Sequence, residues 1–188
     1  SKAVTGRNLV VLKGGYGDHF AQSFPPSVEI AVGVAAQRLH LLSGVAGWAW
    51  PYGGDDVKGQ PAMKLTAAYA DGSKEVFTFK NGIEFVDYIG DADVKGSKRA
   101  RGLTNGGQIR VMTIVPARDG VITSLTVESL GNGITPVIAA ITAELPGVEK
   151  KGGGPEIRST PDAAAPAGAA APAGAPGAWV PNKKKVLL

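Results

Sequence analysis

The chain has 188 residues, a net charge of +4 at pH 7, no cysteine and a hydrophobic fraction of 44%. This length fits one domain of ordinary size with a core of its own. The lack of cysteine excludes disulfides, thiolate zinc sites and cysteine nucleophiles. No apolar run approaches the roughly 20 residues that a membrane-spanning helix needs.

The positive charge lies mostly near the end of the chain. Six basic and three acidic residues lie from Glu149 onward, so this part carries +3 and the body carries +1. Binding to duplex nucleic acid needs a clustered basic face. The nearly neutral body therefore argues against a nucleic-acid partner.

Short apolar runs separated by turn residues predict β-strands along almost the whole body. The expected strands are residues 8–12, 28–34, 38–44, 63–70, 74–80, 108–115, 121–129 and 134–144. The clearest local signal is Asp71-Gly72, which suits the tight turn of a hairpin between residues 63–70 and 74–80. In residues 121–129, Val121, Thr123, Leu125 and Val127 are expected on one face.

The last of these runs has two interpretations. The alanines of residues 134–144 would suit a short helix. Pro136 and the β-branched Ile138, Ile141 and Thr142 favour a final strand instead. With no long helix expected, the pattern predicts an all-β, antiparallel β-sandwich over residues 1–148.

From Gly152 the composition changes. Residues 149–177, with repeated Ala-Pro-Ala-Gly units, are expected to form an extended linker because they cannot bury a core. Residues 178–188 either form a docking peptide or remain a solvated tail. As a docking peptide they would contact a partner through the following residues: Trp179, Lys183, Lys184, Lys185 and Leu187.

Histidine-based chemistry has little support. His40 lies inside an apolar strand, where a packed or sheet-facing histidine is the ordinary explanation. His19 lies in a polar loop and is a candidate ligand or metal contact. No Gly-x-Ser-x-Gly nucleophile elbow accompanies either histidine, so we expect no hydrolase of that type and no catalytic residues.

Two pairs of carboxylates lie in glycine- and lysine-rich loops: Asp55-Asp56, and Asp91 with Asp93. Solvated turn acids are the ordinary interpretation. One alternative is a pair of facing acids of the kind that glycosidases use. Another is a structural calcium ion, because Ca²⁺ takes oxygen ligands of this kind. We expect no other cofactor.

An aromatic loop at residues 47–54 is the strongest candidate for a binding surface. Two of the three tryptophans lie within three residues of each other, and Trp48, Trp50 and Tyr52 have two-residue spacing. An extended segment would place these rings on one face, where they would stack on the apolar faces of sugars. The alternative is a lid that folds its tryptophans over the core. Asp55, Asp56 and Tyr88 are candidate polar partners.

A basic loop follows at residues 95–102. Arg99 and Arg101 are expected to be solvated, with a contact to an anion or to a partner as the alternative.

Five stretches carry a resemblance to a known family: residues 28–33, 38–42, 68–73, 81–88 and 135–144. Together they resemble a galactose-binding-like, carbohydrate-binding-module-like sandwich of large extracytoplasmic proteins of planctomycete-type bacteria. The resemblance covers most of residues 17–145. It implies a jelly-roll fold and an extracytoplasmic location (periplasmic, cell surface or secreted), and it carries no catalytic residues.

The combined expectation is a non-catalytic module that contacts glycan through the aromatic loop. The alternative is a structural subunit of a larger extracytoplasmic assembly, in which the C-terminal tail docks on a neighbouring chain.

Overall fold

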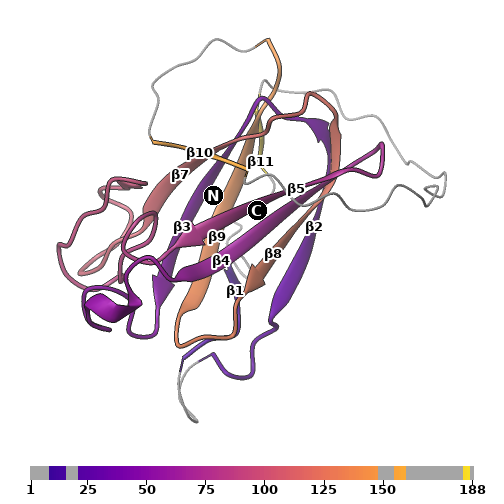
Figure 1. Ribbon diagram of the computed structural model, residues 1–188. Helices are drawn as coiled ribbons and strands as arrows, with labels where there is room; N and C mark the ends of the chain where they lie inside the picture. The colour runs from indigo at the N-terminus through magenta and orange to yellow at the C-terminus, as the bar shows by residue number, and fades with distance from the viewer. Residues whose placement is uncertain (1–8, 16–20, 148–154, 160–183, 187–188) are drawn as a thin grey trace, which may run out of the picture.

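The computed structural model describes residues 9–15, 21–147, 155–159 and 184–186, which form two packed β-sheets (Figure 1). The larger sheet has the strand order β1-β9-β3-β7-β10. Its strands are β1 (Val10–Val11), β3 (Arg38–Ala46), β7 (Arg110–Val115), β9 (Thr135–Glu144) and β10 (Glu156–Arg158). Two short strands lie off this path: β6 (Lys98–Arg99) pairs with β7, and β11 (Lys184–Val186) pairs with β9.

The smaller sheet has the strand order β2-β8-β4-β5. Its strands are β2 (Ser27–Ala35), β4 (Pro61–Tyr69), β5 (Lys74–Lys80) and β8 (Val121–Ser129). The hairpin expected around Asp71-Gly72 joins β4 to β5. Among the described residues the only helix is the single 3-10 turn η1 (Asp55–Val57). No helix in this part of the chain is long and apolar enough to cross a membrane.

The topology is that of an eight-stranded jelly roll. Apart from the β4–β5 hairpin, the chain changes sheet at each step through β1, β2, β3, β4, β5, β7, β8 and β9. The resulting orders, β1-β9-β3-β7 and β2-β8-β4-β5, interleave early and late strands as two Greek keys do. The predicted all-β sandwich is therefore confirmed, including residues 135–144 as a strand rather than a helix.

The core lies between the inner faces of the two sheets. Alternate residues of each strand point inward. The fully buried cluster between the sheets includes Leu39 and Leu41 of β3, Leu65 of β4, and Phe77 and Phe79 of β5. Ring burial on this scale provides much of the stability of a sandwich, because each buried side chain of this size contributes about 1.5–3 kcal/mol.

Strand β8 corrects one prediction. Ile122, rather than Val121 and Thr123, lies in the core together with Leu125 and Val127. The pairing of β8 shifts register against both neighbours at Thr123. An extra residue at a bulge reverses which face the following side chains occupy, so the simple alternation failed there.

The sandwich also extends beyond residue 148. Strand β10 lies within the predicted linker and pairs with β7 in parallel, and Ile157 packs against the core. Residues 135–144 are therefore not the final strand. Within the segment predicted to dock on a neighbour, the backbone of β11 pairs with β9 of the same chain.

Candidate functional site

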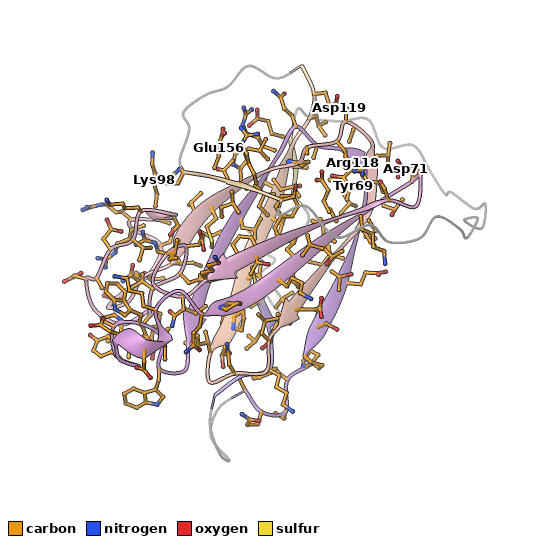
Figure 2. All side chains as sticks on the ribbon, viewed as in Figure 1. Tyr69, Asp71, Lys98, Arg118, Asp119 and Glu156 are labelled. Carbon is orange, nitrogen blue, oxygen red and sulfur yellow. The ribbon has the colours of Figure 1, made fainter. Side chains whose placement is uncertain are left out.

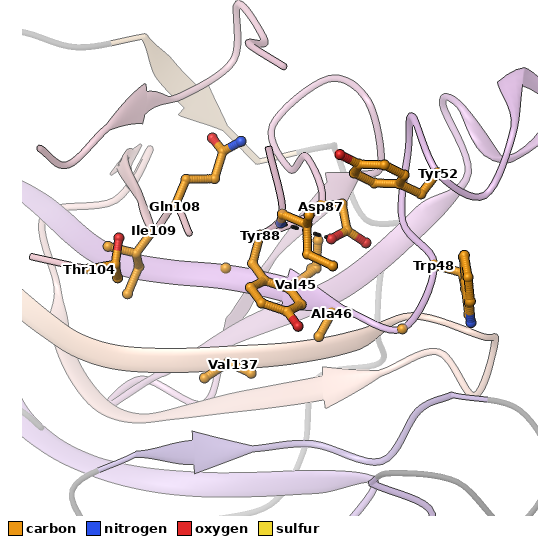
Figure 3. Close-up of a pocket in the computed structure, with 13 residues that line it drawn as sticks. Val45, Ala46, Trp48, Tyr52, Asp87, Tyr88, Thr104, Gln108, Ile109 and Val137 are labelled. Atoms are coloured by element: carbon orange, nitrogen blue, oxygen red, sulfur yellow. Dashed lines mark hydrogen bonds between the residues drawn. The ribbon is translucent and has the colours of Figure 1, made fainter. Parts of the chain in front are cut away.

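A hollow of about 810 Å³ lies at the end of β3, where the loops after β3, β5 and β6 meet the larger sheet (Figure 3). We call it the aromatic cavity. Its lining residues are Gly44, Val45, Ala46, Gly47, Trp48, Tyr52, Asp87, Tyr88, Ile89, Thr104, Gln108, Ile109 and Val137.

Small residues form the floor of the aromatic cavity. Gly44 and Ala46 point to the face of β3 opposite the core residue Val45, because successive strand residues alternate. A Cβ atom added at Gly44 would have the carbonyl oxygen of Gln108 as its nearest neighbour, at 3.8 Å. The pairing of β3 with β7 ends at Ser43. The sheet is therefore hollow at this point because its side chains are short.

Three aromatic side chains surround the opening. Trp48 is 66% exposed, Tyr52 49% and Tyr88 47%, and Figure 3 shows their rings spaced around the same hollow. Among the described residues, the hydroxyls of Tyr52 and Tyr88 have no hydrogen-bond partner. The rim therefore offers ring faces and two hydroxyl groups to a ligand.

The chain turns sharply through the aromatic loop instead of running extended. Trp48 has a φ of 64°, in the left-handed region. The next residue, Ala49, is fully buried. The turn buries Ala49 and leaves Trp48 outside, so Trp48 does not act as a core lid.

Trp50 is separated from the other two rings, which corrects the expectation of a single aromatic face. Its indole N–H donates to Oδ1 of Asp55 at 2.9 Å, and Nζ of Lys58 lies 4.6 Å from the centre of its ring. Trp50 does not line the aromatic cavity. The prediction from the two-residue spacing was wrong because it assumed an extended backbone.

Asp55 and Asp56 lie in η1, also outside the cavity lining. Asp55 holds the Trp50 indole, and the backbone oxygen of Asp56 accepts a hydrogen bond from Gln60 at 2.9 Å. Of the three candidate polar partners, the structure brings only Tyr88 to the cavity.

A buried carboxylate, Asp87, joins the aromatic loop to the segment that carries Tyr88. Its Oδ2 accepts from the backbone N–H of Ala49 at 2.9 Å, and its Oδ1 accepts from that of Ile89 at 3.0 Å. Burial raises the pKa of Asp87, while these two hydrogen bonds lower it in part. Sequence reasoning missed Asp87. A lone acid between Val86 and Tyr88 was the available signal for a buried structural carboxylate.

Gln108 supports the opposite wall in the same way. Its side-chain amide nitrogen donates to the carbonyl oxygens of Gly90 and Ala92 at 3.2 and 3.1 Å. Its backbone N–H donates to the carbonyl oxygen of Tyr88 at 2.7 Å. The side chains of Asp87 and Gln108 at the base of the cavity therefore form hydrogen bonds within the protein. Nothing in the local sequence marked Gln108 for this role.

The basic loop contains β6, which pairs with β7 to form a hairpin beside the cavity. Nη1 of Arg99 donates to Asp91 at 2.7 Å, and Nη2 of Arg110, a fully buried side chain, donates to Asp93 at 2.6 Å. Asp91 and Asp93 thus lie against arginines. In the described parts of the chain, no group of three His, Cys, Asp or Glu side chains is arranged to hold a metal ion.

His40 is sheet-facing, as expected. Its two ring nitrogens lie 3.1 Å from Oγ1 of Thr113 and 3.0 Å from Oε2 of Glu144, and Arg38 donates to Glu144 at 2.9 Å. The order hydroxyl, imidazole, carboxylate has the form of a catalytic triad. Thr113 is buried, however, and neither it nor His40 lines the aromatic cavity. The cluster ties β3, β7 and β9 together.

Several predicted contacts lie outside the described residues: His19, Trp179, Lys183 and Leu187. For Lys184 and Lys185 the structure describes the backbone pairing with β9 alone.

Comparison of the chain with family models, curated proteins and solved structures found no match. The resemblance to galactose-binding-like modules therefore stays a prediction. What the structure itself establishes is a jelly roll with a hollow, aromatic-rimmed end.

Proposed function

We propose that this domain is a non-catalytic module that binds a glycan in the aromatic cavity. The observation that carries the proposal is the set of three exposed rings around a floor of small residues. Aromatic faces suit the apolar faces of sugar rings, and ligand pockets combine such surfaces with a few polar groups. The free hydroxyls of Tyr52 and Tyr88 are suited to reading sugar hydroxyl groups.

The cavity lining supports a binding role more than a catalytic one. Glycoside hydrolysis needs two facing carboxyl groups. Asp87 is the only carboxylate among the lining residues, and both of its oxygens accept backbone N–H groups. An extracytoplasmic location, which the family resemblance implies, would place the module where polysaccharides occur.

The alternative, a structural subunit that assembles through its tail, has less support. The part of the tail that the structure describes, β11, has its partner strand within the chain. Assembly through Trp179 and the terminal residues remains a prediction from the sequence.

The test is direct binding of polysaccharides to the full chain, by affinity electrophoresis and calorimetry. Trp48→Ala should weaken binding about 3- to 10-fold, since one ring contact contributes on the order of 1 kcal/mol. Tyr52→Phe and Tyr88→Phe should each weaken it by removing one hydroxyl. Phe24→Ala is the matched control, because Phe24 is exposed but does not line the cavity.

The melting temperature should stay nearly unchanged in Trp48→Ala, because a largely exposed ring contributes little to stability. If no neutral or acidic polysaccharide binds, or if the Trp48, Tyr52 and Tyr88 variants all bind like the native chain, the proposed function is wrong.

A further inference from the structure

A second hollow adjoins the aromatic cavity. It measures about 260 Å³ and is lined by Arg99, Ala100, Arg101, Gly102, Thr104 and Gly107. Thr104 lines both hollows. A Cβ atom added at Gly107 would lie 3.4 Å from Cδ2 of Tyr88, so the second hollow borders the ring that stands over the first. One elongated ligand can therefore occupy both.

The positive charge of the body is concentrated in residues 91–110, which include the residues that line this second hollow. Residues 91–110 contain five basic and two acidic residues, whereas residues 1–90 and 111–148 together contain nine basic and eleven acidic residues. A module of almost neutral body thus has a net charge of +3 in the hairpin region beside its cavity.

The arginines of this region have different roles. Arg110 is buried and donates to Ser97, Gln108 and Asp93. Arg99 is held by Asp91 and lies 3.4 Å from the carbonyl oxygen of Gly107, so it fixes the hairpin. These two guanidinium groups maintain the shape of the wall.

Arg101 differs from both. It is exposed and has no hydrogen bond or ion pair among the described residues. The pKa of nearby Asp93 is lowered mainly by its hydrogen bond from Arg110 and to a smaller extent by the charge of Arg101. Asp93, the acid whose pKa the charge of Arg101 affects, is therefore already paired with Arg110. The Arg101 guanidinium remains available for an outside anion.

We propose that the ligand is an acidic polysaccharide, whose sugar ring lies in the aromatic cavity and whose ring-borne carboxylate or sulfate is bound by Arg101 in the second hollow. This inference rests on the proposed function. An arginine fork suits either anion because its paired N–H donors match two oxygens of a planar carboxylate or of a sulfate.

The experiment compares charged polymers with their uncharged counterparts on the full chain. The first pair is polygalacturonate and its fully methyl-esterified form. The second pair is carrageenan and chemically desulfated carrageenan. The charged member of at least one pair should bind about tenfold more tightly, as expected for a charge-assisted hydrogen bond, and the preference should shrink as salt is added. The pair that shows the preference identifies the anion as carboxylate or sulfate.

Arg101→Gln should remove this preference while leaving binding of the uncharged polymer unchanged, and Arg101→Lys should keep part of it. Arg118→Gln is the matched control. Arg118 is an exposed arginine in the β7–β8 loop, and Figure 2 shows it across the molecule from Lys98 of the basic hairpin. It should leave both affinities unchanged.

The two proposals fail differently. If charged and uncharged polymers bind equally and Arg101→Gln changes neither affinity, the acidic ligand is wrong while glycan binding stands. If no polymer binds, glycan binding is itself wrong, and the acidic ligand with it. If Arg101→Gln and Arg118→Gln weaken binding equally, the preference reflects overall charge and the assignment to Arg101 is overturned.

Discussion

The carboxylate of Asp87 accepts a hydrogen bond from the backbone N–H of Ala49 at 2.9 Å, although the two residues are 38 positions apart in the sequence. In return, the backbone N–H of Asp87 donates to the carbonyl oxygen of Trp50 at 2.8 Å. These bonds attach the aromatic loop to the segment that carries Tyr88. The rim of the cavity therefore depends on one buried acid that itself presents no free oxygen to a ligand.

Replacing that acid should loosen the rim. Asp87→Ala leaves the N–H groups of Ala49 and Ile89 without their partner, and an unsatisfied buried donor costs about 1–3 kcal/mol. We expect the free energy of unfolding, measured by urea denaturation, to fall by about that amount, and glycan affinity to fall with it. An unchanged free energy of unfolding would show that Asp87 does not support the loop.

Filling the floor should block the cavity without disturbing the core. Gly44→Leu places a side chain in the space where a Cβ atom meets only the oxygen of Gln108, at 3.8 Å. We expect glycan binding, measured by calorimetry, to be lost while the melting temperature changes little. Gly44→Ala, which adds one carbon, should retain most of the affinity. Native-like affinity in Gly44→Leu would place the ligand elsewhere on the molecule.

The pH dependence of stability should reflect Glu144. Burial raises its pKa, but hydrogen bonds from His40 and Arg38 outweigh burial, so the folded-state pKa lies below the usual 4.5. A lowered pKa means that the stabilisation by Glu144 is fully present above about the unfolded value and is lost as pH falls through the folded value.

The Glu144→Gln variant should therefore lose less stability than the native chain as the pH falls below about 4.5. The measurement is urea denaturation at several pH values. Glu128→Gln is the control, because the side chain of Glu128 is 38% exposed and lies 3.7 Å from Nζ of Lys64 in a surface pair. If the two variants lose stability in parallel with the native chain, Glu144 does not account for the acid sensitivity.

Strand β10 should contribute to stability although it lies in a stretch of linker-like composition. Ile157 packs against the core, so Ile157→Ala should lower the free energy of unfolding by about 1–2 kcal/mol, less than the 2–5 kcal/mol of a fully buried isoleucine. The neighbouring Arg158→Ala should change it by less than about 0.5 kcal/mol, as surface substitutions do. Equal effects in thermal melts would mean that β10 does not pack on the sandwich.

Local patterns determined most of the fold. Alternating apolar residues in 28–34 and 74–80, and the Asp71-Gly72 turn between two such runs, predict strands and a hairpin, because side chains alternate across a strand with a fixed period. The strand order of the jelly roll was implied by the family resemblance, not by these patterns. The faces of β8 needed the structure, since one unpaired residue at Thr123 reverses them.

The candidate site was only partly determined by the sequence. The two-residue spacing singled out Trp48, Trp50 and Tyr52, and Tyr88 was a candidate polar partner. Of these four, the structure brings all but Trp50 to one cavity. Only the tertiary structure separated Trp50 from them, because the turn at Trp48 and the bond from Trp50 to Asp55 depend on backbone angles that spacing does not encode. The role of Asp87 was likewise decided by a partner distant in the sequence, Ala49, since a hydrogen bond depends on which groups the fold brings within about 3 Å.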